Sequence, residues 1–584
     1  MIGLISATRA GATARDRLAA ALPGRCRVYD GPVREAMRRA FAECDQLVCF
    51  LATGATVRIL APLLEDKASD PGVICVDEAG RHAVALLGGH GGGANTLARE
   101  VAELLPGCTP VVTTASDARD VSGLDQLGLP VEGDVAAVGR AILDGERVAL
   151  RADAVWPLPA LPENVVPAAG AEGERPSPTL YVTDRTEPPE IPDRPAAHPT
   201  PQATLRPPSL ILGIGASRGA PADEILTLIS AALLEARLSP LSIAALATVD
   251  AKADEPGLLA AARQLGVPLR THPADELAAV AVPNPSAAPL AAVGTPSVAE
   301  AAALAAAGPG AELVLPKRKS APAEGRPAMA TCAIARRRPR GRLTLVGLGP
   351  GARDLLTPRA RDELRRASVV VGLDQYVNQI RDLLRPGTRI LESGLGAEEE
   401  RARTAVAEAR AGHAVALIGS GDAGVYAMAS PALVAAGSAD DLDIVGVPGV
   451  TAALAAGALL GAPLGHDHAS ISLSDLHTPW EVIEQRVRAA ADGDFVVTFY
   501  NPRSRGRDWQ LPKALGILAE RRGPATPVGV VRNASRPGES YRVTTLGELD
   551  PDTVDMMSVV VVGNSATRIA GGRMVTPRGY RWQV

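Results

Sequence analysis

The chain has 584 residues, a net charge of -5 and an aromatic content of 3%. This length exceeds what one hydrophobic core supports, so three or four domains are expected. The balanced charge and the scarcity of aromatic rings argue against a nucleic-acid partner, and no stretch of eighteen uninterrupted apolar residues predicts a membrane-spanning helix.

The N-terminal 22 residues are apolar and rich in alanine, but we do not expect them to be an export signal. Arg9, Arg15, Asp16 and Arg17 interrupt the segment before an apolar stretch of the required length develops. The six cysteines show no CxxC spacing. We therefore expect reduced core cysteines in a cytoplasmic protein, without disulfides or a bound metal.

Residues 1–150 read as an α/β domain. Strands are expected at residues 2–6, 47–51 and 73–76 because these runs are short and apolar. A further strand at residues 82–87 runs into the sequence GGHGGGAN, which precedes a helical pattern. This places a glycine-rich loop at the N-terminus of a helix.

Residues 151–208 are dense in proline, so we expect mainly an extended connecting segment, interrupted by one short strand at residues 179–185. A second α/β domain is expected at residues 209–335, opening with the glycine turn of LILGIGASRG. The basic run at residues 336–341 then reads as a linker. A solvated tether is favoured over a nucleic-acid patch, because isolated charge runs are usually solvated.

Residues 342–584 open with TLVGLGPG, an apolar strand followed by a glycine-proline turn. Thr357-Pro358 predicts a helix start, and residues 367–372 predict the next strand, so the unit is strand, turn, helix and strand. The GLGPG turn departs from the G-x-G-x-x-G dinucleotide fingerprint. By itself it indicates only that backbone approaches a ligand closely.

Three further segments combine a strand with a polar or glycine-rich loop. They are LIGSGDAGVYAMAS, DIVGVPGVTAA and DFVVTFYNPRSRGRDWQL, which begin at residues 417, 443 and 494. Each loop follows the carboxyl end of a strand, where open α/β sheets bind ligands. The four loops together predict one ligand site.

These segments, with GAPLGHDHASISLSDLHTPWEVIEQR and PVGVVRNASRPGE, resemble the tetrapyrrole methyltransferases and, within them, the precorrin-3B C(17)-methyltransferase family. The resemblance implies a multidomain α/β protein in which a two-lobed methyltransferase fold follows two smaller α/β domains. It also implies methyl transfer from S-adenosyl-L-methionine to a polycarboxylate tetrapyrrole, with ring contraction to precorrin-4, by a homodimer formed through this domain. No metal is expected there, because the sulfonium is already an activated electrophile and alignment is the main task.

The same resemblance implies the residues that bind the cofactor. They are Gly349, Pro350, Gly351, Gly421, Asp422, Gly424, Val425, Met428, Pro448, Gly449, Thr451, Ala453, Tyr500, Asn501, Asn533, Ala534 and Thr545. Asp422 is also the catalytic candidate, placed near the cofactor cation or in proton transfer, and its alternative role is a local Asx cap.

Four arginines are candidates for the substrate carboxylates, because guanidinium groups offer bidentate pairing. They are Arg353, Arg503, Arg532 and Arg536. For each of them, an ordinary surface role is the alternative.

The N-terminal half resembles the cobalt-precorrin-5A hydrolase family in ATGATVR, VVTTASD, GIGASRG, VDAKADEPGLLA and VGTPSVAEAAAL. The resemblance implies opening of a lactone on the corrinoid with release of acetaldehyde, two steps after the methylation. His90 is the candidate base, with a hydrogen-bonded structural histidine as the alternative. Lys67 and Lys252 are candidates for substrate carboxylates. The residues Asp70, Asp77, Glu78, Asn95, Asp117 and Glu255 match the family without an assigned role.

The leading hypothesis is therefore a bifunctional enzyme of cobalamin biosynthesis. One alternative makes residues 1–335 a non-catalytic corrinoid carrier, and another assigns the methyl group to a different ring position. Cobalt-free precorrin-3B and cobalt-factor III both remain open as the substrate.

Overall fold

The computed structural model describes residues 1–66, 69–89, 92–113, 123–168, 177–187, 200–321, 327–394, 396–438, 441–504 and 506–579. The chain divides into two compact units. Unit 1 comprises residues 1–154, 161–339 and 385–387, and unit 2 comprises residues 155–160, 340–384 and 388–584. Sheets with helices packed against them confirm the predicted multidomain α/β class.

The first sheet of unit 1 has the order β2-β1-β3-β4-β5-β6. Its strands are β1 (Ile2–Ser6), β2 (Cys26–Val28), β3 (Gln46–Phe50), β4 (Gly72–Val76), β5 (His82–Leu87) and β6 (Thr109–Val111). Alternate strand residues pack on opposite faces. Helices α1 (Arg9–Ala21) and α4 (Ala94–Leu104) cover one face, and α2 (Val33–Glu43) and α3 (Thr53–Leu60) cover the other.

The second sheet corrects the expectation that residues 151–208 are mainly a connecting segment. Its order is β7-β11-β10-β8-β9. The strands are β7 (Val131–Gly133), β8 (Val148–Ala152), β9 (Val165–Pro167), β10 (Thr179–Val182) and β11 (Gln202–Leu205), with α6 (Val135–Asp144) between β7 and β8. The strands that the sequence did not indicate are only three to five residues long, and a pattern this short is hard to recognise beside proline-rich segments.

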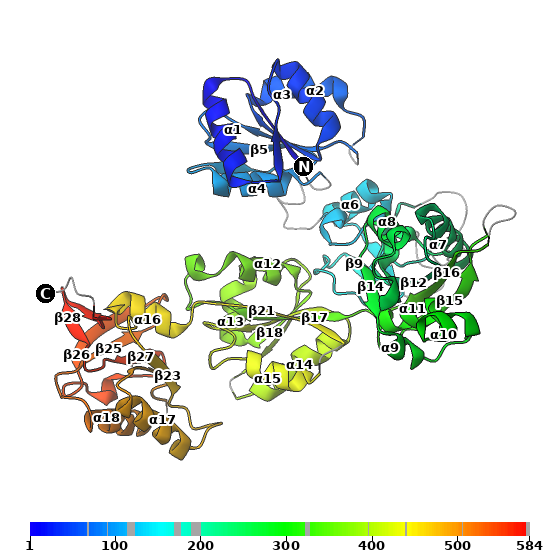
Figure 1. Ribbon diagram of the computed structural model, residues 1–584. Helices are drawn as coiled ribbons and strands as arrows, with labels where there is room; N and C mark the ends of the chain where they lie inside the picture. The colour runs from blue at the N-terminus through cyan, green and yellow to red at the C-terminus, as the bar shows by residue number, and fades with distance from the viewer. Residues whose placement is uncertain are drawn as a thin grey trace. The chain divides into compact units, whose positions relative to one another are not determined.

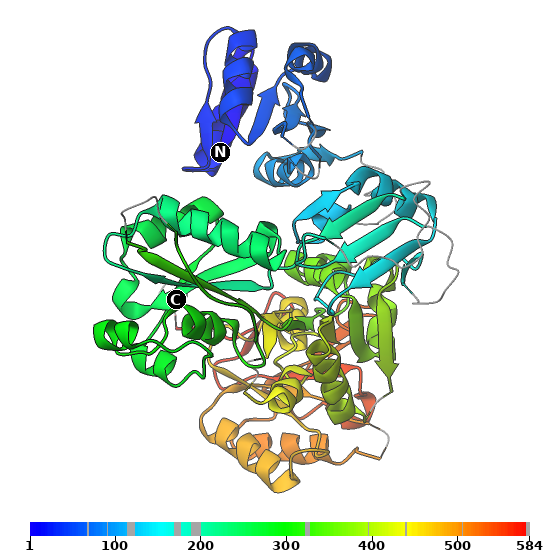
Figure 2. The same cartoon turned by 90° about the vertical axis from the view of Figure 1, so that its right-hand side faces the viewer.

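The third sheet, with helices on both faces, has the order β14-β13-β12-β16-β15 (Figure 2). Its strands are β12 (Leu210–Ala216), β13 (Ile243–Val249), β14 (Leu269–His272), β15 (Glu312–Lys319) and β16 (Ala330–Arg336). One face carries α7 (Ala222–Ala236) and α8 (Pro256–Leu265), and the other carries α9 (Ala274–Ala278) and α11 (Ala299–Ala307). A Cβ atom at Gly213 would lie 1.8 Å from the carbonyl oxygen of Ala299, so glycine at this position lets α11 pack closely against β12.

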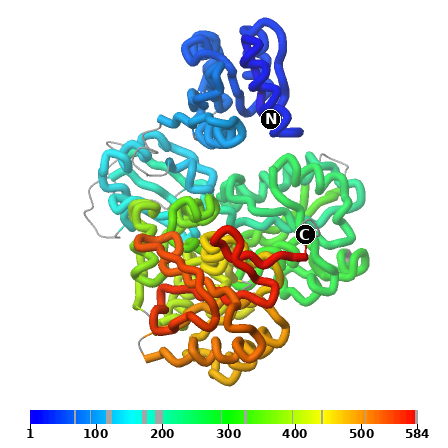
Figure 3. The backbone as a smooth tube through the Cα atoms, turned by 90° about the vertical axis from the view of Figure 1, so that its left-hand side faces the viewer, coloured from blue at the N-terminus to red at the C-terminus, as the bar shows by residue number. Residues whose placement is uncertain are grey.

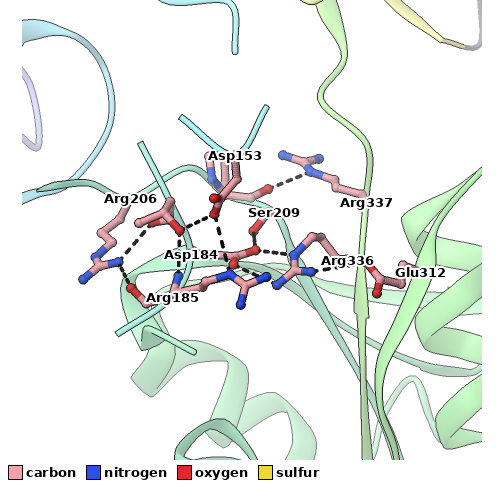
Figure 4. Close-up of polar contacts among 10 residues, drawn as sticks. Asp153, Asp184, Arg185, Arg206, Ser209, Glu312, Arg336 and Arg337 are labelled. Carbon is pink, nitrogen blue, oxygen red and sulfur yellow. Dashed lines mark hydrogen bonds and ion pairs between the residues drawn. The ribbon is translucent and has the colours of Figure 1, made fainter. Parts of the chain in front are cut away.

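Two arginines of the expected basic linker are part of a polar network (Figure 4). Arg336 ends β16 and binds the carboxylate of Asp184, with Nε to Oδ2 at 2.7 Å and Nη2 to Oδ1 at 3.0 Å. Asp184 is 4% exposed and also accepts a hydrogen bond from Ser209 Oγ at 2.6 Å. Arg337 Nε donates to the carbonyl oxygen of Pro208 at 2.7 Å. These arginines are therefore packing elements rather than a solvated tether.

The first lobe of unit 2 is a parallel sheet of order β19-β18-β20-β17-β21. Its strands are β17 (Gly341–Gly347), β18 (Val369–Leu373), β19 (Arg389–Ser393), β20 (Ala414–Gly419) and β21 (Leu442–Val447). Figure 1 shows α12 (Pro358–Arg366) on one side of the sheet and α14 (Glu398–Arg410) and α15 (Ala429–Ala436) on the other. Thr357 Oγ1 accepts the amide of Ala360 at 3.2 Å, which confirms the predicted helix start.

The second lobe, orange to red in Figure 3, has a mixed sheet of order β23-β24-β27-β25-β26. Its strands are β23 (His468–Ser472), β24 (Val496–Tyr500), β25 (Pro527–Arg532), β26 (Ser540–Thr545) and β27 (Ser558–Val562). Helices α17 (Trp480–Asp492) and α18 (Gln510–Ala519) cover one face, and α16 (Ala452–Leu460) covers the other. No helix within the described ranges is long and apolar enough to span a bilayer.

Candidate functional site

The loops after β17, β20 and β21 meet at the carboxyl edge of the first lobe, where these three strands are neighbours. Gly349 and Gly421 exchange backbone hydrogen bonds of 3.0 and 2.8 Å. Both adopt left-handed backbone, with φ of 74° and 67°. A Cβ atom at Gly449 would lie 2.1 Å from the carbonyl oxygen of Gly421. Only glycine permits this approach, so three loops that are far apart in sequence form one backbone surface.

Asp422 connects two of these loops through its half-buried carboxylate. Oδ1 accepts the amide of Gly424 at 2.8 Å, and Oδ2 accepts the amide of Gly449 at 3.0 Å. The first bond is the Asx cap that the sequence left open as an alternative. The second bond joins the β20 and β21 loops, and no local pattern indicated it. Among the described residues, no cationic side chain lies within 4.0 Å of this carboxylate.

Side chains of the predicted cofactor set line the same region. Met428 and Ala453 are buried, while Val425 and Thr451 are half-buried. Tyr500, at the end of β24, accepts the amide of Ala453 at 2.9 Å through its hydroxyl, which also lies 2.7 Å from Thr451 Oγ1. The second lobe thereby holds the start of α16.

Tyr426 is a residue of this region that the sequence reasoning missed. Its ring centroid lies 5.1 Å from that of Tyr500, and its hydroxyl donates to the carbonyl oxygen of Ser470 at 2.7 Å. The backbone is left-handed, with φ of 52°, and the side chain is 52% exposed. An aromatic residue two positions after the GDAG turn was the available signal.

The remaining cofactor candidates lie on the second lobe, and the structure separates one of them from the rest. Asn501 and Asn533 follow β24 and β25, and both have left-handed backbone, with φ of 49° and 51°. Ala534, the residue after Asn533, is half-buried. Thr545 pairs with Pro527 at the opposite end of β25, roughly 16 Å along the strand. We therefore drop Thr545 from the proposed cofactor site.

Three of the four candidate arginines are already paired with carboxylates. Arg503 Nη1 lies 2.5 Å from Asp552, and Arg532 Nε lies 2.7 Å from Asp555. The third is Arg353, which pairs with Asp382. Binding a substrate carboxylate at these positions would require an exchange of partner.

Arg536 differs from the other three because it binds neutral oxygen atoms. Its Nε donates to the carbonyl oxygen of Pro350 at 2.6 Å, and its Nη2 donates to Ser420 Oγ at 2.7 Å. A Cβ atom at Gly351 would lie 2.5 Å from Arg536 Cγ. The side chain thus reaches from the loop after β25 onto the glycine loops of the first lobe.

In unit 1, the candidates His90, Lys67 and Asp117 lie outside the described residues. Lys252 Nζ lies 3.2 Å from Glu255, whose other oxygen accepts the amide of Gly219 at 2.7 Å. The Gly219 amide, with Lys252, lowers the pKa of Glu255. This contact joins the loops after β12 and β13 at the carboxyl edge of the third sheet.

The other matched residues of unit 1 have structural roles or deep burial. Asp77 accepts the amides of Arg81 and His82, each at 2.7 Å, and so shapes the turn between β4 and β5. Asn95 is 3% exposed. Over the part of the chain that the structure describes, no cluster of three His, Cys, Asp or Glu side chains could hold a metal ion.

Family models match three parts of the chain. The model for tetrapyrrole (corrin/porphyrin) methylases matches residues 342–550. The models for the N-terminal and C-terminal regions of cobalamin synthesis protein G match residues 35–117 and 210–335.

Residues of the C-terminal part are also similar to individual proteins. A probable cobalt-factor III C(17)-methyltransferase from Salmonella typhimurium is 46% identical, covering 41% of this chain and 99% of its own. A precorrin-3B C(17)-methyltransferase from Sinorhizobium is 41% identical, covering 41% of this chain and 97% of its own. The crystal structure of the methyltransferase CobJ is 41% identical and covers 41% of this chain and all of its own, with a TM-score of 0.39.

Several other curated relatives match over only about half of their own length. The chain covers nearly the whole length of the Salmonella and Sinorhizobium relatives, and the methylase family model begins at residue 342, at the start of the first lobe. The chain therefore belongs, through its C-terminal part, to the C(17)-methyltransferases of the tetrapyrrole methylase family, and it carries both regions of the cobalamin synthesis G family in front of them.

Proposed function

We propose that the chain is a bifunctional enzyme of cobalamin biosynthesis. Its C-terminal part methylates C(17) of a tetrapyrrole at the precorrin-3 stage, with ring contraction. Its N-terminal half opens the lactone of cobalt-precorrin-5A and releases acetaldehyde. The observation that carries the methyltransferase assignment is the meeting of three glycine loops at one strand edge, in a stretch 46% identical to a C(17)-methyltransferase.

The residues at these loops fit S-adenosyl-L-methionine, which supplies a methyl group on a positively charged sulfur. The loops present backbone, with Gly424 and Pro448 exposed. Met428 and Ala453 offer an apolar wall, and the carboxylate of Asp422 supplies negative charge. A cationic ligand with an apolar body would meet complementary groups on both sides.

The chain's own contribution is to hold this surface rigid. Asp422 ties the β20 loop to the β21 loop, while Tyr500 fixes the amide of Ala453 and the hydroxyl of Thr451 from the second lobe. Alignment of a ring carbon with an activated methyl group needs a rigid site more than it needs a strong base. Arg536 is the best-placed candidate for a substrate carboxylate, because no described carboxylate occupies it.

The experiment that tests the methyltransferase supplies methyl-labelled S-adenosyl-L-methionine with either precorrin-3B or cobalt-factor III. We expect one new methyl group at C(17), located by mass and carbon labelling, from at least one of these substrates. The named relatives include both substrates, so the two reactions also decide whether cobalt is present at this step. Methylation only at another ring position would overturn the assignment.

For the hydrolase, the family models supply the main support, together with the contact of Lys252, Glu255 and Gly219 at one strand edge. His90 is the proposed base, and Lys67 and Lys252 are proposed to hold substrate carboxylates. The test is release of acetaldehyde from the lactone substrate by the full chain. In a His90→Ala variant we expect acetaldehyde release to be lost and methylation to be retained. If the wild type binds the pigment tightly without releasing acetaldehyde, the N-terminal half is a carrier.

We also infer a homodimer formed through the methyltransferase part, in a cytoplasmic setting. Leu433, Val434 and Leu454 on α15 and α16 are 50%, 80% and 55% exposed, and a partner would cover such apolar side chains. All six cysteines are free, in keeping with a reducing compartment. Light scattering on the wild type and on Val434→Asp tests the dimer. A wild-type monomer would contradict it.

A further inference from the structure

Arg401 on α14 is a buried guanidinium that no described carboxylate neutralises. Its residue is 5% exposed. Nε donates to Ser393 Oγ at 3.0 Å, Nη2 donates to the carbonyl oxygen of Gly394 at 2.8 Å, and Nη1 lies 3.5 Å from the thioether of Met428. An arginine has five N–H donors, so two remain, and a third has only a weak sulfur acceptor.

A buried positive charge is costly unless a counter-charge or several strong acceptors surround it. Two other buried arginines of the chain meet this condition. Arg206 pairs with Glu132. Arg522 donates to three backbone carbonyl oxygens, those of Gly563, Ala490 and Phe495, although its Nε has no partner among the described residues. Arg401 has one carbonyl, one hydroxyl and one thioether, which leaves its charge undercompensated.

A second cation lies in the same region. Arg536 binds Ser420 and Pro350, and no described carboxylate pairs with it either. Burial raises the pKa of the Tyr376 phenol, the positive charges of Arg536 and Arg401 act to lower it, and the negative charge of Glu398 on α14 acts weakly to raise it. Both guanidinium groups are therefore close enough to act on one phenol.

The neighbours of these arginines come from three adjacent strands of the sheet. Ser393 ends β19, Tyr376 lies on α13 (Asp374–Ile380) directly after β18, and Ser420 follows β20. All three positions are at the carboxyl edge, where open α/β sheets bind ligands. Met428, which contacts Arg401, belongs to the loop that also carries Asp422. The two cations thus border the proposed cofactor surface.

We propose that Arg401 and Arg536 form a carboxylate-binding subsite beside the glycine loops. The carboxylate comes either from a peripheral acid side chain of the tetrapyrrole or from the amino-acid end of the cofactor. This inference rests on the proposed methyltransferase function and adds a residue, Arg401, that the sequence motifs did not single out. The competing role for Arg401 is a structural one, in which it only holds the end of β19 against α14.

The test compares Arg401→Ala and Arg401→Lys in the full chain with the control Arg403→Ala. Arg403 lies on the same helix, is 66% exposed in its side chain and pairs with the exposed Glu399, so its removal reports on general effects. Two quantities are measured: the affinity for S-adenosylhomocysteine by calorimetry, and the KM for the tetrapyrrole that the wild type methylates. The affinity for an analogue of S-adenosylhomocysteine that lacks the carboxyl group is measured in the same way.

If the carboxylate is that of the cofactor, Arg401→Ala weakens S-adenosylhomocysteine binding by about tenfold to a hundredfold, as expected for a charge-assisted hydrogen bond. Binding of the decarboxylated analogue then stays unchanged. If the carboxylate belongs to the ring, S-adenosylhomocysteine affinity stays constant and the KM for the tetrapyrrole rises by a similar factor. Arg401→Lys keeps the charge and retains part of the affinity in both cases.

The proposal is overturned if Arg401→Ala folds and changes neither quantity. It is also overturned if Arg401→Lys loses as much as Arg401→Ala, because a purely structural role depends on the guanidinium fork rather than on the charge. Should Arg401→Ala fail to fold, Arg536→Ala carries the same comparison, since this side chain is only half-buried. Failure of the wild type to bind S-adenosylhomocysteine would instead contradict the methyltransferase function itself.

Discussion

At the scale of single residues, Asp422 shows how one side chain combines two roles. The sequence predicted it to be a catalytic residue or a local Asx cap. Its two carboxylate oxygens accept amides from different loops, Gly424 in its own turn and Gly449 across the gap. The residue that was predicted to be catalytic therefore also sets the spacing of the surface on which the cofactor is proposed to bind.

We predict that Asp422→Ala lowers turnover far more than it lowers stability. Losing two hydrogen bonds from a half-buried carboxylate should cost about 1–3 kcal/mol of unfolding free energy. A loss of about 1.4 kcal/mol corresponds to a tenfold change. We expect turnover to fall by more than tenfold. Urea unfolding and steady-state kinetics give the two numbers. Asp422→Asn, which keeps one acceptor oxygen, is the matched variant, and normal turnover in Asp422→Ala would remove the residue from the catalytic set.

Tyr500→Phe should mainly weaken cofactor binding. The change removes the hydroxyl that accepts the Ala453 amide and contacts Thr451, at a cost of about 1–2 kcal/mol. Because α16 begins at these residues, we expect a higher KM for the cofactor with a smaller change in kcat. Thr451→Val removes only one of the two contacts and should have the weaker effect. Equal effects of the two changes would argue against the Tyr500 hydroxyl as the organising group.

At the scale of elements, the strand-and-loop units follow from short sequence patterns. The apolar runs before GLGPG, GDAG and PGVT each form a buried strand, and Thr357 caps the predicted helix. The patterns did not indicate that β17 lies between β20 and β21. This strand order brings the three loops together, and it depends on pairing between segments that are far apart in sequence, as in the pairs Arg342 with Ala414 and Gly341 with Leu442.

The packing of these loops predicts that alanine substitutions at two glycines near the end of β21 have different effects on ligand binding. Gly449→Ala places a methyl group 2.1 Å from the Gly421 carbonyl oxygen, so the loops must separate. We expect S-adenosylhomocysteine binding to fall at least tenfold. Gly446→Ala has no atom within 4 Å of the added carbon and should bind normally. Calorimetry on both variants is the measurement, and equal affinities would contradict the loop geometry.

At the scale of the whole molecule, unit 1 and unit 2 are separate compact units that carry different proposed reactions. Within unit 1, the second sheet is tied to the third by the ion pair of the buried Asp184 with the half-buried Arg336, which are 152 residues apart (Figure 4). The domain boundaries expected from the sequence stay predictions. Strand β8 of the second sheet spans the expected boundary at residue 150.

Asp184→Ala should destabilise unit 1 and leave methylation intact. Removing the carboxylate leaves Arg336 and Ser209 without their buried partner, which should cost about 3–5 kcal/mol. Glu312 is the matched control, because it pairs with the same arginine at 3.2 Å but its side chain is 69% exposed. Glu312→Ala should cost less than about 1 kcal/mol. Calorimetric unfolding together with a methylation assay distinguishes the two units, and loss of methylation in Asp184→Ala would contradict their independence.

The sequence by itself determined the features that depend on neighbouring residues. These are the α/β class, most strands and loops of the first and third sheets of unit 1 and of the first lobe of unit 2, and the motifs that mark the family. Tertiary structure alone decided which distant residues meet. It placed Arg536 on Pro350, 186 residues away, put Thr545 at the far end of its strand, and built a sheet from a proline-rich segment. The physical reason is that local patterns specify backbone conformation and burial, whereas strand order and side-chain partners arise from long-range packing that no short window of sequence contains.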